Sequence, residues 1–251
     1  MKGKADVLGI PVDNVTISSA TELLIKMMNS DGGGIVNFIN AHCANIAQSD
    51  SDYRSVLDDC DYLFGDGSGV SIASWMCGQP LVDNVNGTDL APLLFEEMAQ
   101  KELSLYLIGG RPGVAKEVSD KLLEKFPQLH IVGLTHGYHN DTAWQAVISD
   151  LDEKKPHLVM VAMGVPLQEK WIAKWAHKLP NSVFMGVGGL FDFLSQRIPR
   201  APQWLRKIGM EWSYRLYQEP SRMWRRYIIG NVLFLMRALR HSVLSGTMAS
   251  A

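Results

Sequence analysis

The sequence has few cysteines and no long apolar run, and each absence excludes a class of protein. Its three cysteines, Cys43, Cys60 and Cys77, are widely spaced and form no C-x-x-C pair. This argues against both a zinc site and a disulfide framework, and it is typical of a reducing compartment. No stretch approaches the roughly 18–20 apolar residues that a membrane-spanning helix needs. Because residues 1–10 lack the apolar core of a signal peptide, we expect a cytoplasmic protein.

Charge is unevenly distributed along the chain, although the net value is only -2. Residues 197–251 contain ten Lys and Arg residues against Glu211 and Glu219, whereas residues 1–196 contain 14 basic and 24 acidic residues. The 47% hydrophobic and 20% charged content is that of a globular protein with one substantial core. We predict an acidic body with a basic tail, and we expect no nucleic-acid partner.

Short apolar runs alternate with helical patterns in the acidic body. Strands that alternate with helices of this length indicate βαβ units and a largely parallel sheet. The predicted fold class is α/β, a Rossmann-like, mostly parallel sheet with helices on both faces plus a C-terminal helical appendage. The predicted strands are residues 34–39, 62–64, 103–108, 130–134, 158–163 and 182–186, and the main predicted helices are 19–28, 52–60, 70–75, 88–101, 114–126 and 168–178.

After Pro199 the pattern changes to helices alone, over residues 202–208, 209–218 and 220–243. The last of these mixes aromatic and aliphatic residues with five arginines, as interfacial helices at a membrane surface do. The alternative is that part of this apolar face packs on the α/β body. We divide the chain into a catalytic domain, residues 1–196, and a basic amphipathic appendage for membrane association, residues 197–251.

One acidic residue stands between glycines at a predicted strand–turn–helix junction. The apolar run 62–64 leads into Gly65-Asp66-Gly67, which places Asp66 at the carboxyl end of a buried strand. Open α/β sheets bind their ligands at this edge, and the glycines permit a tight turn and close approach of a ligand. Asp66 is therefore either a general base or a residue that only caps the following helix.

A second glycine-rich turn follows the strand predicted at 103–108. Gly109-Gly110-Arg111-Pro112-Gly113 precedes a helix, and backbone N–H groups at a helix start attract phosphate, with Arg111 as a further anion contact. The pattern is not G-x-G-x-x-G, and no acidic residue follows at the usual distance, which disfavours a nicotinamide cofactor. We expect no cofactor. The alternative is an ordinary tight turn.

Two further segments are predicted near the same sheet edge. Asn86-Gly87-Thr88-Asp89 by itself is best explained as a turn followed by a helix N-cap. Gln168 and Glu169 follow the turn that begins at Gly164, and they are predicted to point toward the edge that carries Asp66. Acidic residues are common in a first helical turn for dipole reasons alone, so Glu169 is weak evidence of a site.

The sequence predicts no metal site. Asp-x-Asp triplets at 50–52, 59–61 and 150–152 are predicted at solvated helix ends, where they could not hold a nucleotide-bound metal. His136 and His139 are too few for a metal centre. From the residues alone we predict an enzyme that takes one phosphorylated soluble substrate and one anionic lipid substrate.

A series of short motifs extends over most of the chain. The motifs are Asn40-Ala41-His42, Phe64-Gly65-Asp66-Gly67, Asn86-Gly87-Thr88-Asp89-Leu90, Leu107-Ile108-Gly109-Gly110, residues 163–171, residues 186–192, Arg200-Ala201-Pro202, Glu211-Trp212, Tyr214-Arg215-Leu216, Glu219-Pro220-Ser221-Arg222 and Arg225-Arg226-Tyr227. In their order and spacing these motifs resemble the WecG/TagA/CpsF glycosyltransferases. The resemblance is closest to the branch that includes the xanthan glucosyltransferase GumM, mainly through residues 83–89.

This resemblance implies an inverting, metal-independent transfer of a sugar from a UDP-sugar to a sugar on undecaprenyl diphosphate, at the inner face of the cell membrane. It implies a role in exopolysaccharide assembly, with transfer of β-glucose. Asp66 matches the general base and Asn40 a polar residue beside it. The expected substrate-binding residues are His42, Gly67, Asn86, Thr88, Asp89, Gly109, Gly110, Arg111, Tyr138, Gly164, Gln168 and Glu169, and the expected membrane or diphosphate contacts are Arg200, Arg215, Arg222, Arg225 and Arg226.

Two positions depart from many members of the family. Phe38 stands where many have Thr, and Asn84 stands where many have Arg, which leaves the transferred sugar open. An N-acetylmannosamine or N-acetylmannosaminuronic acid transferase is the alternative within the family. Outside it, the alternatives are a nucleotide-sugar hydrolase or epimerase and a non-catalytic nucleotide-binding membrane module. A homo-oligomer is also compatible with the sequence.

Overall fold

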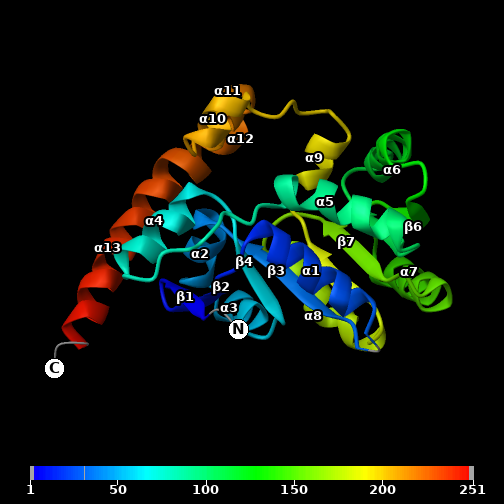
Figure 1. Ribbon diagram of the computed structural model, residues 1–251, viewed down its shortest axis with the longest axis horizontal. Coiled ribbons are helices and arrows are strands. Elements are labelled where there is room, and N and C mark those ends of the chain that lie inside the picture. Colours follow the sequence, from blue (N-terminus) through cyan, green and yellow to red (C-terminus); the bar gives the residue numbers. More distant parts are fainter. Residues whose placement is uncertain (1–2, 31, 249–251) are drawn as a thin grey trace.

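The computed structural model describes residues 3–30 and 32–248 as one mostly parallel sheet with helices on both faces (Figure 1). The strand order is β1-β2-β4-β3-β8-β7-β5-β6. Within the described part of the chain, every pairing is parallel except that of the β1–β2 hairpin. The predicted fold class is confirmed. The strands are β1 (Lys4–Val7), β2 (Ile10–Asp13), β3 (Gly34–Ile39), β4 (Tyr62–Gly65), β5 (Ser104–Gly109), β6 (His130–Thr135), β7 (Leu158–Ala162) and β8 (Val183–Gly186).

Helices cover both faces of this sheet. Buried residues of α1, α5, α6 and α9 form the core on one face, and those of α2, α3, α4, α7, α8 and α13 pack on the other. The helices are α1 (Ile17–Met28), α2 (Ala41–Ala47), α3 (Ser51–Asp58), α4 (Ser68–Met76), α5 (Gly87–Gln100), α6 (Val114–Lys125), α7 (Asp141–Lys154), α8 (Leu167–Trp175), the short η1 (Ala176–Lys178), α9 (Leu190–Leu194), α10 (Gln203–Lys207), α11 (Glu211–Gln218), α12 (Pro220–Trp224), the π-helix η2 (Arg225–Ile229) and α13 (Gly230–Met248).

The central strands are buried on both faces, which explains their continuous apolar sequences. In β5, Leu105 and Leu107 belong to the core under α5 and α6, whereas Tyr106 and Ile108 pack toward α7 and α8. Successive side chains of a strand point to opposite faces, so a strand covered twice needs apolar residues throughout. The predicted strands could be recognised for this reason.

The order in which strands are added to the sheet changes direction between β3 and β8, although the two strands are parallel. β3 pairs with β4 on one side and with β8 on the other. The helix after β3, α2, lies on one face of the sheet, and the helix after β8, α9, lies on the opposite face. A crevice opens where the connections of neighbouring strands diverge in this way, and α/β proteins bind ligands there.

The C-terminal helices return to the α/β body after crossing above the carboxyl edge of the sheet (Figure 1). α13 runs beside α4 and also contacts α2. Its Phe234 and Ala238 are fully buried in the body's core, and the Asn45 side chain donates to the Gly230 carbonyl at 2.7 Å. One face of α13 is thus docked on the body. Within the described residues, no helix combines the length and apolar character needed to cross a membrane.

The β1–β2 hairpin is an element that the sequence pattern does not predict. Its two turn residues, Leu8 and Gly9, have φ values of 57° and 77°. Such turns usually contain Asn or Asp before Gly, because few other residues adopt this conformation. Because the first turn residue is a leucine, the sequence does not indicate a turn here. Pro11 within β2 also argues against a strand at this position.

Candidate functional site: a cleft at the carboxyl edge of the sheet

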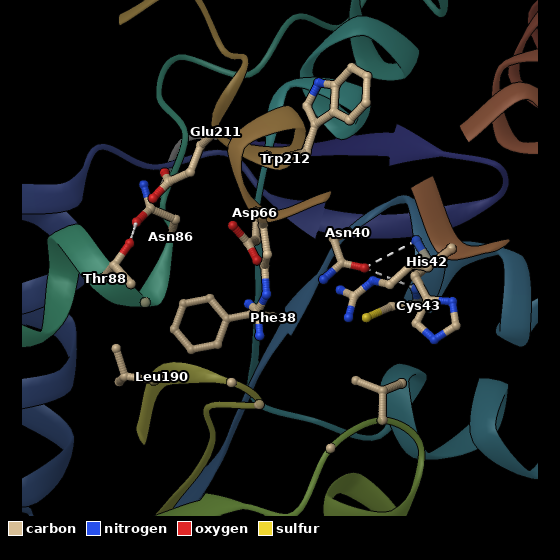
Figure 2. Close-up of a pocket in the computed structure, with 18 of the residues that line it drawn as sticks. Phe38, Asn40, His42, Cys43, Asp66, Asn86, Thr88, Leu190, Glu211 and Trp212 are labelled. Atoms are coloured by element: carbon tan, nitrogen blue, oxygen red, sulfur yellow. Dashed lines mark hydrogen bonds between the residues drawn. The ribbon is translucent and has the colours of Figure 1, made fainter. Parts of the chain in front are cut away.

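A cleft of about 1370 Å³ lies between the carboxyl edge of the sheet and the C-terminal helices. Residues following β3, β4, β5, β6, β7 and β8 line its floor, and residues of α10, α11, η2 and α13 line the opposite wall. The cleft coincides with the point where the strand order reverses. Figure 2 shows Asp66 near its centre, with Asn40 and Phe38 beside it and Trp212 and Glu211 above.

Asp66 is held at this edge by the strand before it and the turn after it. Its N–H donates to the Ile39 carbonyl of the neighbouring strand at 2.8 Å. α4 begins at Ser68 with Gly67 as N-cap, at a φ of 97° and without a side-chain cap. Asp66 therefore does not cap α4, and its partly exposed side chain is turned into the cleft.

Asn40 links the start of α2 to Asp66. Its Oδ1 accepts the N–H groups of His42 and Cys43 at 3.0 and 3.1 Å, which makes it the N-cap of α2. Oδ1 is engaged by these two N–H groups, and the side-chain NH₂ of Asn40 donates a hydrogen bond to the Asp66 carboxylate. This contact fixes the carboxylate and favours its charged form.

The charge balance around Asp66 suits a proton acceptor. Burial raises the pKa of the Asp66 carboxyl, whereas Arg226, the Asn40 hydrogen bond and Arg215 act in the opposite direction, and Glu211 raises it further. A carboxylate whose pKa is raised by burial is a stronger base than an exposed one, and the two arginines oppose that rise by favouring the charged form.

Two neighbours of Asn40 carry no charge at neutral pH. Burial, together with the nearby Arg226, lowers the pKa of His42 to about 4, so its imidazole is neutral. Burial raises the pKa of the Cys43 thiol to about 11, which keeps it protonated. Both residues line the cleft. His42 is thus available for neutral hydrogen bonds, while Cys43 is not a candidate nucleophile.

Residues 86–89 form a self-contained polar turn at the start of α5. The Asn86 Oδ1 accepts from the Asp89 N–H at 2.9 Å and from the Thr88 hydroxyl at 2.6 Å. Asn86, and not Thr88 or Asp89, is therefore the N-cap of α5. Asn86 and Thr88 line the cleft, whereas the Asp89 carboxylate pairs with Arg200 at 2.6 Å outside the lining.

The glycine-rich turn after β5 also borders the cleft. Gly109 packs so closely on β7 that a Cβ would overlap the Ala162 carbonyl, and it does not line the cleft. Gly110, Arg111 and Tyr138 do line it. The backbone thus approaches the cleft where the sequence predicts an anion site.

Gln168 ties two turns of the cleft floor together. Its Oε1 accepts the Gly164 N–H at 3.2 Å and the Gly188 N–H at 2.9 Å, and its Nε2 donates to the Glu169 Oε1 at 2.9 Å. Gln168 and Gly164 line the cleft, although Gln168 is 2% exposed. All three bonds are internal, so Gln168 shapes the floor by fixing both turns.

Glu169 lies beneath this floor and not in it. It is 0% exposed, and its Oε2 has no hydrogen-bond partner in the described part of the chain. Burial raises the pKa of the Glu169 carboxyl to about 7, because water no longer stabilises its charge. Glu169 therefore cannot contact a substrate in the cleft directly.

Replacement of Glu169 should make stability less sensitive to pH. The folded protein holds a proton at Glu169 up to about pH 7, against about 4.5 for an ordinary Glu, so the free energy of unfolding falls as pH rises through this window. At ~1.4 kcal/mol per pKa unit, we expect the free energy of unfolding of Glu169→Gln to rise by about 3 kcal/mol relative to that of wild type between pH 4.5 and pH 8. Urea unfolding at both pH values measures it, with the exposed Glu22→Gln as control. Equal pH dependence in both variants would contradict the assignment.

The tail arginines divide into those that line the cleft and those that do not. Arg215, Arg222 and Arg226 line it, whereas Arg200 pairs with Asp89 outside the lining and Arg225 is exposed beside the Trp224 ring. The Arg215 guanidinium lies directly on the Gly189 turn, where a Cβ would come within 2.7 Å of its Nη2.

Ion pairs hold Arg215 and Arg222 against the body across the cleft. Arg215 pairs with Asp192 at 3.7 Å and with Glu219 at 3.6 Å. Arg222 contacts the same two carboxylates, at 3.9 and 3.0 Å. Asp192 belongs to α9 of the body, so this network joins α11 and α12 to the floor.

Several lining residues are not among the expected site residues. Phe38 and Asn84, the two departures from the family pattern, both line the cleft, and Asn84 Oδ1 accepts the Gly67 N–H at 2.6 Å. Glu211 lines it too and pairs with Arg200 at 3.3 Å. Spacing alone does not mark these positions, whereas the family resemblance singled out Phe38 and Asn84 as departures and included Glu211 in a motif. Others in the lining are Leu190, Arg197, Arg206 and Trp212.

The described residues also include one group of possible metal ligands. Asp6, Cys77 and His241 have ligand atoms within 4.8 Å of one another, and His241 Nε2 lies 2.9 Å from Asp6 Oδ1. The three come from distant parts of the chain, which the spacing of cysteines alone does not reveal. None of them lines the cleft.

Comparison with known proteins agrees with this geometry. The model of the "Glycosyl transferase WecG/TagA/CpsF family" matches residues 5–247. A Bacillus subtilis (strain 168) protein named N-acetylglucosaminyldiphosphoundecaprenol N-acetyl-beta-D-mannosaminyltransferase is 32% identical over 220 residues, which cover 87% of this chain and 85% of the relative. The protein of the same name from Bacillus spizizenii is 31% identical over 217 residues, 86% of this chain and 83% of the relative. The chain therefore belongs to the WecG/TagA/CpsF family and is a glycosyltransferase.

Proposed function

We propose that this enzyme transfers a sugar from a UDP-sugar to a sugar carried on undecaprenyl diphosphate, with inversion at the anomeric carbon. The observation that carries the proposal is the Asp66 carboxylate, turned into a large cleft, bonded to Asn40 and facing Arg226. The names of the two relatives, which act on a diphosphoundecaprenol-linked sugar, support this class of acceptor.

The cleft is large enough for two substrates at once. Typical ligand sites occupy ~300–1,000 Å³, and this one measures about 1370 Å³. Direct displacement requires donor and acceptor to be bound together with the reacting atoms in contact. The size of the cleft therefore favours direct transfer between two bound sugars.

In the proposed reaction, Asp66 accepts the proton of the acceptor hydroxyl as its oxygen attacks the anomeric carbon. The bond from that carbon to the diphosphate oxygen breaks, and UDP leaves with the electron pair. Arg226 and Arg215 line the cleft beside Asp66, where they stabilise the charge that develops on the leaving diphosphate. Asn40 orients the base.

Metal independence is also part of the proposal. The three Asp-x-Asp triplets all lie outside the lining of the cleft. The acidic residues of its wall, Asp192, Glu211 and Glu219, are paired with arginines. Each of these acidic side chains is thus already paired with a cation, and the arginines of the wall can supply the positive charge that a leaving diphosphate needs.

Two donors are candidates for the transferred sugar. The stretch 83–89 resembles the glucosyltransferase branch, which favours glucose. Phe38 presents an aromatic ring beside Asp66 in place of the usual Thr, where it can contact the transferred sugar. The names of the two relatives favour N-acetylmannosamine. We propose β-glucosyl transfer in exopolysaccharide assembly as the first candidate and N-acetylmannosaminyl transfer as the second.

The exposed residues of the appendage support a site of action at the cytoplasmic surface of a membrane. On the face of η2 and α13 that is turned away from the body, Ile229 and Met236 are 53% and 57% exposed, and Arg225 and Arg240 are exposed with them. Apolar side chains with interspersed arginines are suited to a surface of anionic lipids. We propose such a surface as the partner of this face.

A product assay tests the proposal. Purified enzyme is incubated with a short-chain polyprenyl-diphosphate sugar, EDTA and, in turn, UDP-glucose, UDP-N-acetylmannosamine and UDP-N-acetylmannosaminuronic acid. We expect one donor to give a lipid-linked product with an inverted anomeric centre, undiminished by EDTA. Transfer from none of the donors, or retention of configuration, would contradict the proposal.

A further inference from the structure

One part of the cleft wall is made of exposed aliphatic side chains. Ile72, Ile208, Ile228, Val232 and Leu235 all line the cleft, and they are 44%, 64%, 53%, 56% and 38% exposed. Aliphatic groups that converge in a cleft and stay in contact with water mark a surface made to be covered. UDP and sugars are too polar to cover it.

These side chains come from two sides of an opening between α4 and the C-terminal helices. Ile228, Val232 and Leu235 recur at helical spacing along η2 and α13, on a different side from the docked Phe234. Ile72 belongs to α4, whose other face carries the buried residues Val70 and Ala73. Since α4 and α13 pack side by side, the aliphatic wall spans both helices.

A smaller hollow adjoins the cleft along α4. It is lined by Ser68, Ser71, Ile72 and Trp75, which form one stripe of that helix, and by Arg206 and Lys207 of α10. Ser68, Ile72 and Arg206 also line the main cleft, so the hollow continues its wall outward. Trp75 is 69% exposed at its outer end.

The groups follow an order that matches one kind of molecule. Asp66 lies in the cleft, Arg206 and Lys207 line the hollow that adjoins it, and aliphatic side chains of α4 and the C-terminal helices line the cleft beside them. An acceptor hydroxyl, a diphosphate and an isoprenoid chain follow one another in the same order along a polyprenyl-diphosphate sugar.

We propose that the first isoprene units of the acceptor lie in this opening, between Ile72 on α4 and Ile228, Val232 and Leu235 on the C-terminal helices. The proposal rests on the proposed function, because it names a subsite for the acceptor of that reaction. The enzyme thereby recognises the lipid within its cleft, in addition to any contact with the membrane surface. α4 of the body, and not the appendage alone, then contributes to selection of the acceptor.

Two acceptors that differ only beyond the diphosphate test this subsite. One carries three isoprene units and the other an ethyl group on the same sugar diphosphate, and both are assayed in detergent without a membrane. We expect Ile72→Ser to lower the ratio of kcat/KM for the prenyl acceptor to that for the ethyl acceptor by about tenfold, because the buried hydrocarbon contacts are lost. Val232→Ser should lower the same ratio from the opposite side of the opening.

The matched control is Leu239→Ser, since Leu239 is 54% exposed on α13 and does not line the cleft. It should keep the wild-type ratio. An unchanged ratio in Ile72→Ser and Val232→Ser, or an equal fall in all three variants, would overturn the subsite. If wild-type enzyme transfers sugar to neither acceptor, the proposed function itself fails, which is a distinguishable result.

Discussion

Asp66→Asn is expected to lower kcat of sugar transfer by about 10²–10⁴-fold while leaving the fold intact. Asn has nearly the same shape as Asp but cannot accept the proton of the attacking hydroxyl. Because Asp66 does not cap α4 and its backbone N–H makes the bond to Ile39, the substitution removes no contact that α4 or β4 needs. Steady-state kinetics with saturating donor and acceptor measure the effect.

The pH profile separates a base from a residue that merely shapes the cleft. Transfer requires the carboxylate form, so the wild-type rate should fall as pH drops through the pKa of Asp66, which burial places above that of an ordinary aspartate. The residual activity of Asp66→Asn should lack this acidic limb. Asp52→Asn, on the exposed surface of α3, is the control and should retain both the rate and the limb. Persistence of the limb in Asp66→Asn would assign it to another group.

The features that sequence reasoning could recover are those encoded over a few adjacent residues. Strands covered on both faces appear as apolar runs, and the turns after β4 and β5 appear as glycines beside Asp66 and Gly109. Parallel strands bring their carboxyl ends to one edge, so a correct fold class already predicts that these turns meet. The hairpin turn at Leu8 could not be predicted, because leucine rarely adopts the positive φ that this residue has.

The features that could not be recovered depend on residues far apart in the chain. The spacing of residues around Arg226 does not indicate that η2 folds back over the cleft and lowers the pKa of Asp66 and of His42, and only the family resemblance suggested a diphosphate contact there. Likewise, Glu169 follows the right turn but enters the interior, because the first turn of α8 directs successive side chains to different sides. The direction of a side chain around a helix start depends on where the helix packs, which local spacing does not specify.

Arg226→Gln is expected to lower kcat/KM by about 10²–10³-fold, the range found when one charge-stabilising donor is removed from an active site. Two effects combine. The variant loses a cation of the cleft wall, where we propose that the leaving diphosphate binds, and it loses the charge that contributes most among the arginines to lowering the pKa of Asp66. The acidic limb of the pH profile should therefore move to higher pH, because the base then holds its proton more tightly.

The matched control is Arg240→Gln, which removes one positive charge from the same basic tail at an exposed position of α13 outside the cleft. If Arg226 acted only by attracting anionic substrates or lipid to the tail, both variants would raise KM to a similar degree and leave the pH profile in place. A direct role in the cleft instead gives a fall in kcat and a shifted limb in Arg226→Gln alone. That combination requires the C-terminal helices to complete the catalytic centre, because Arg226 belongs to η2.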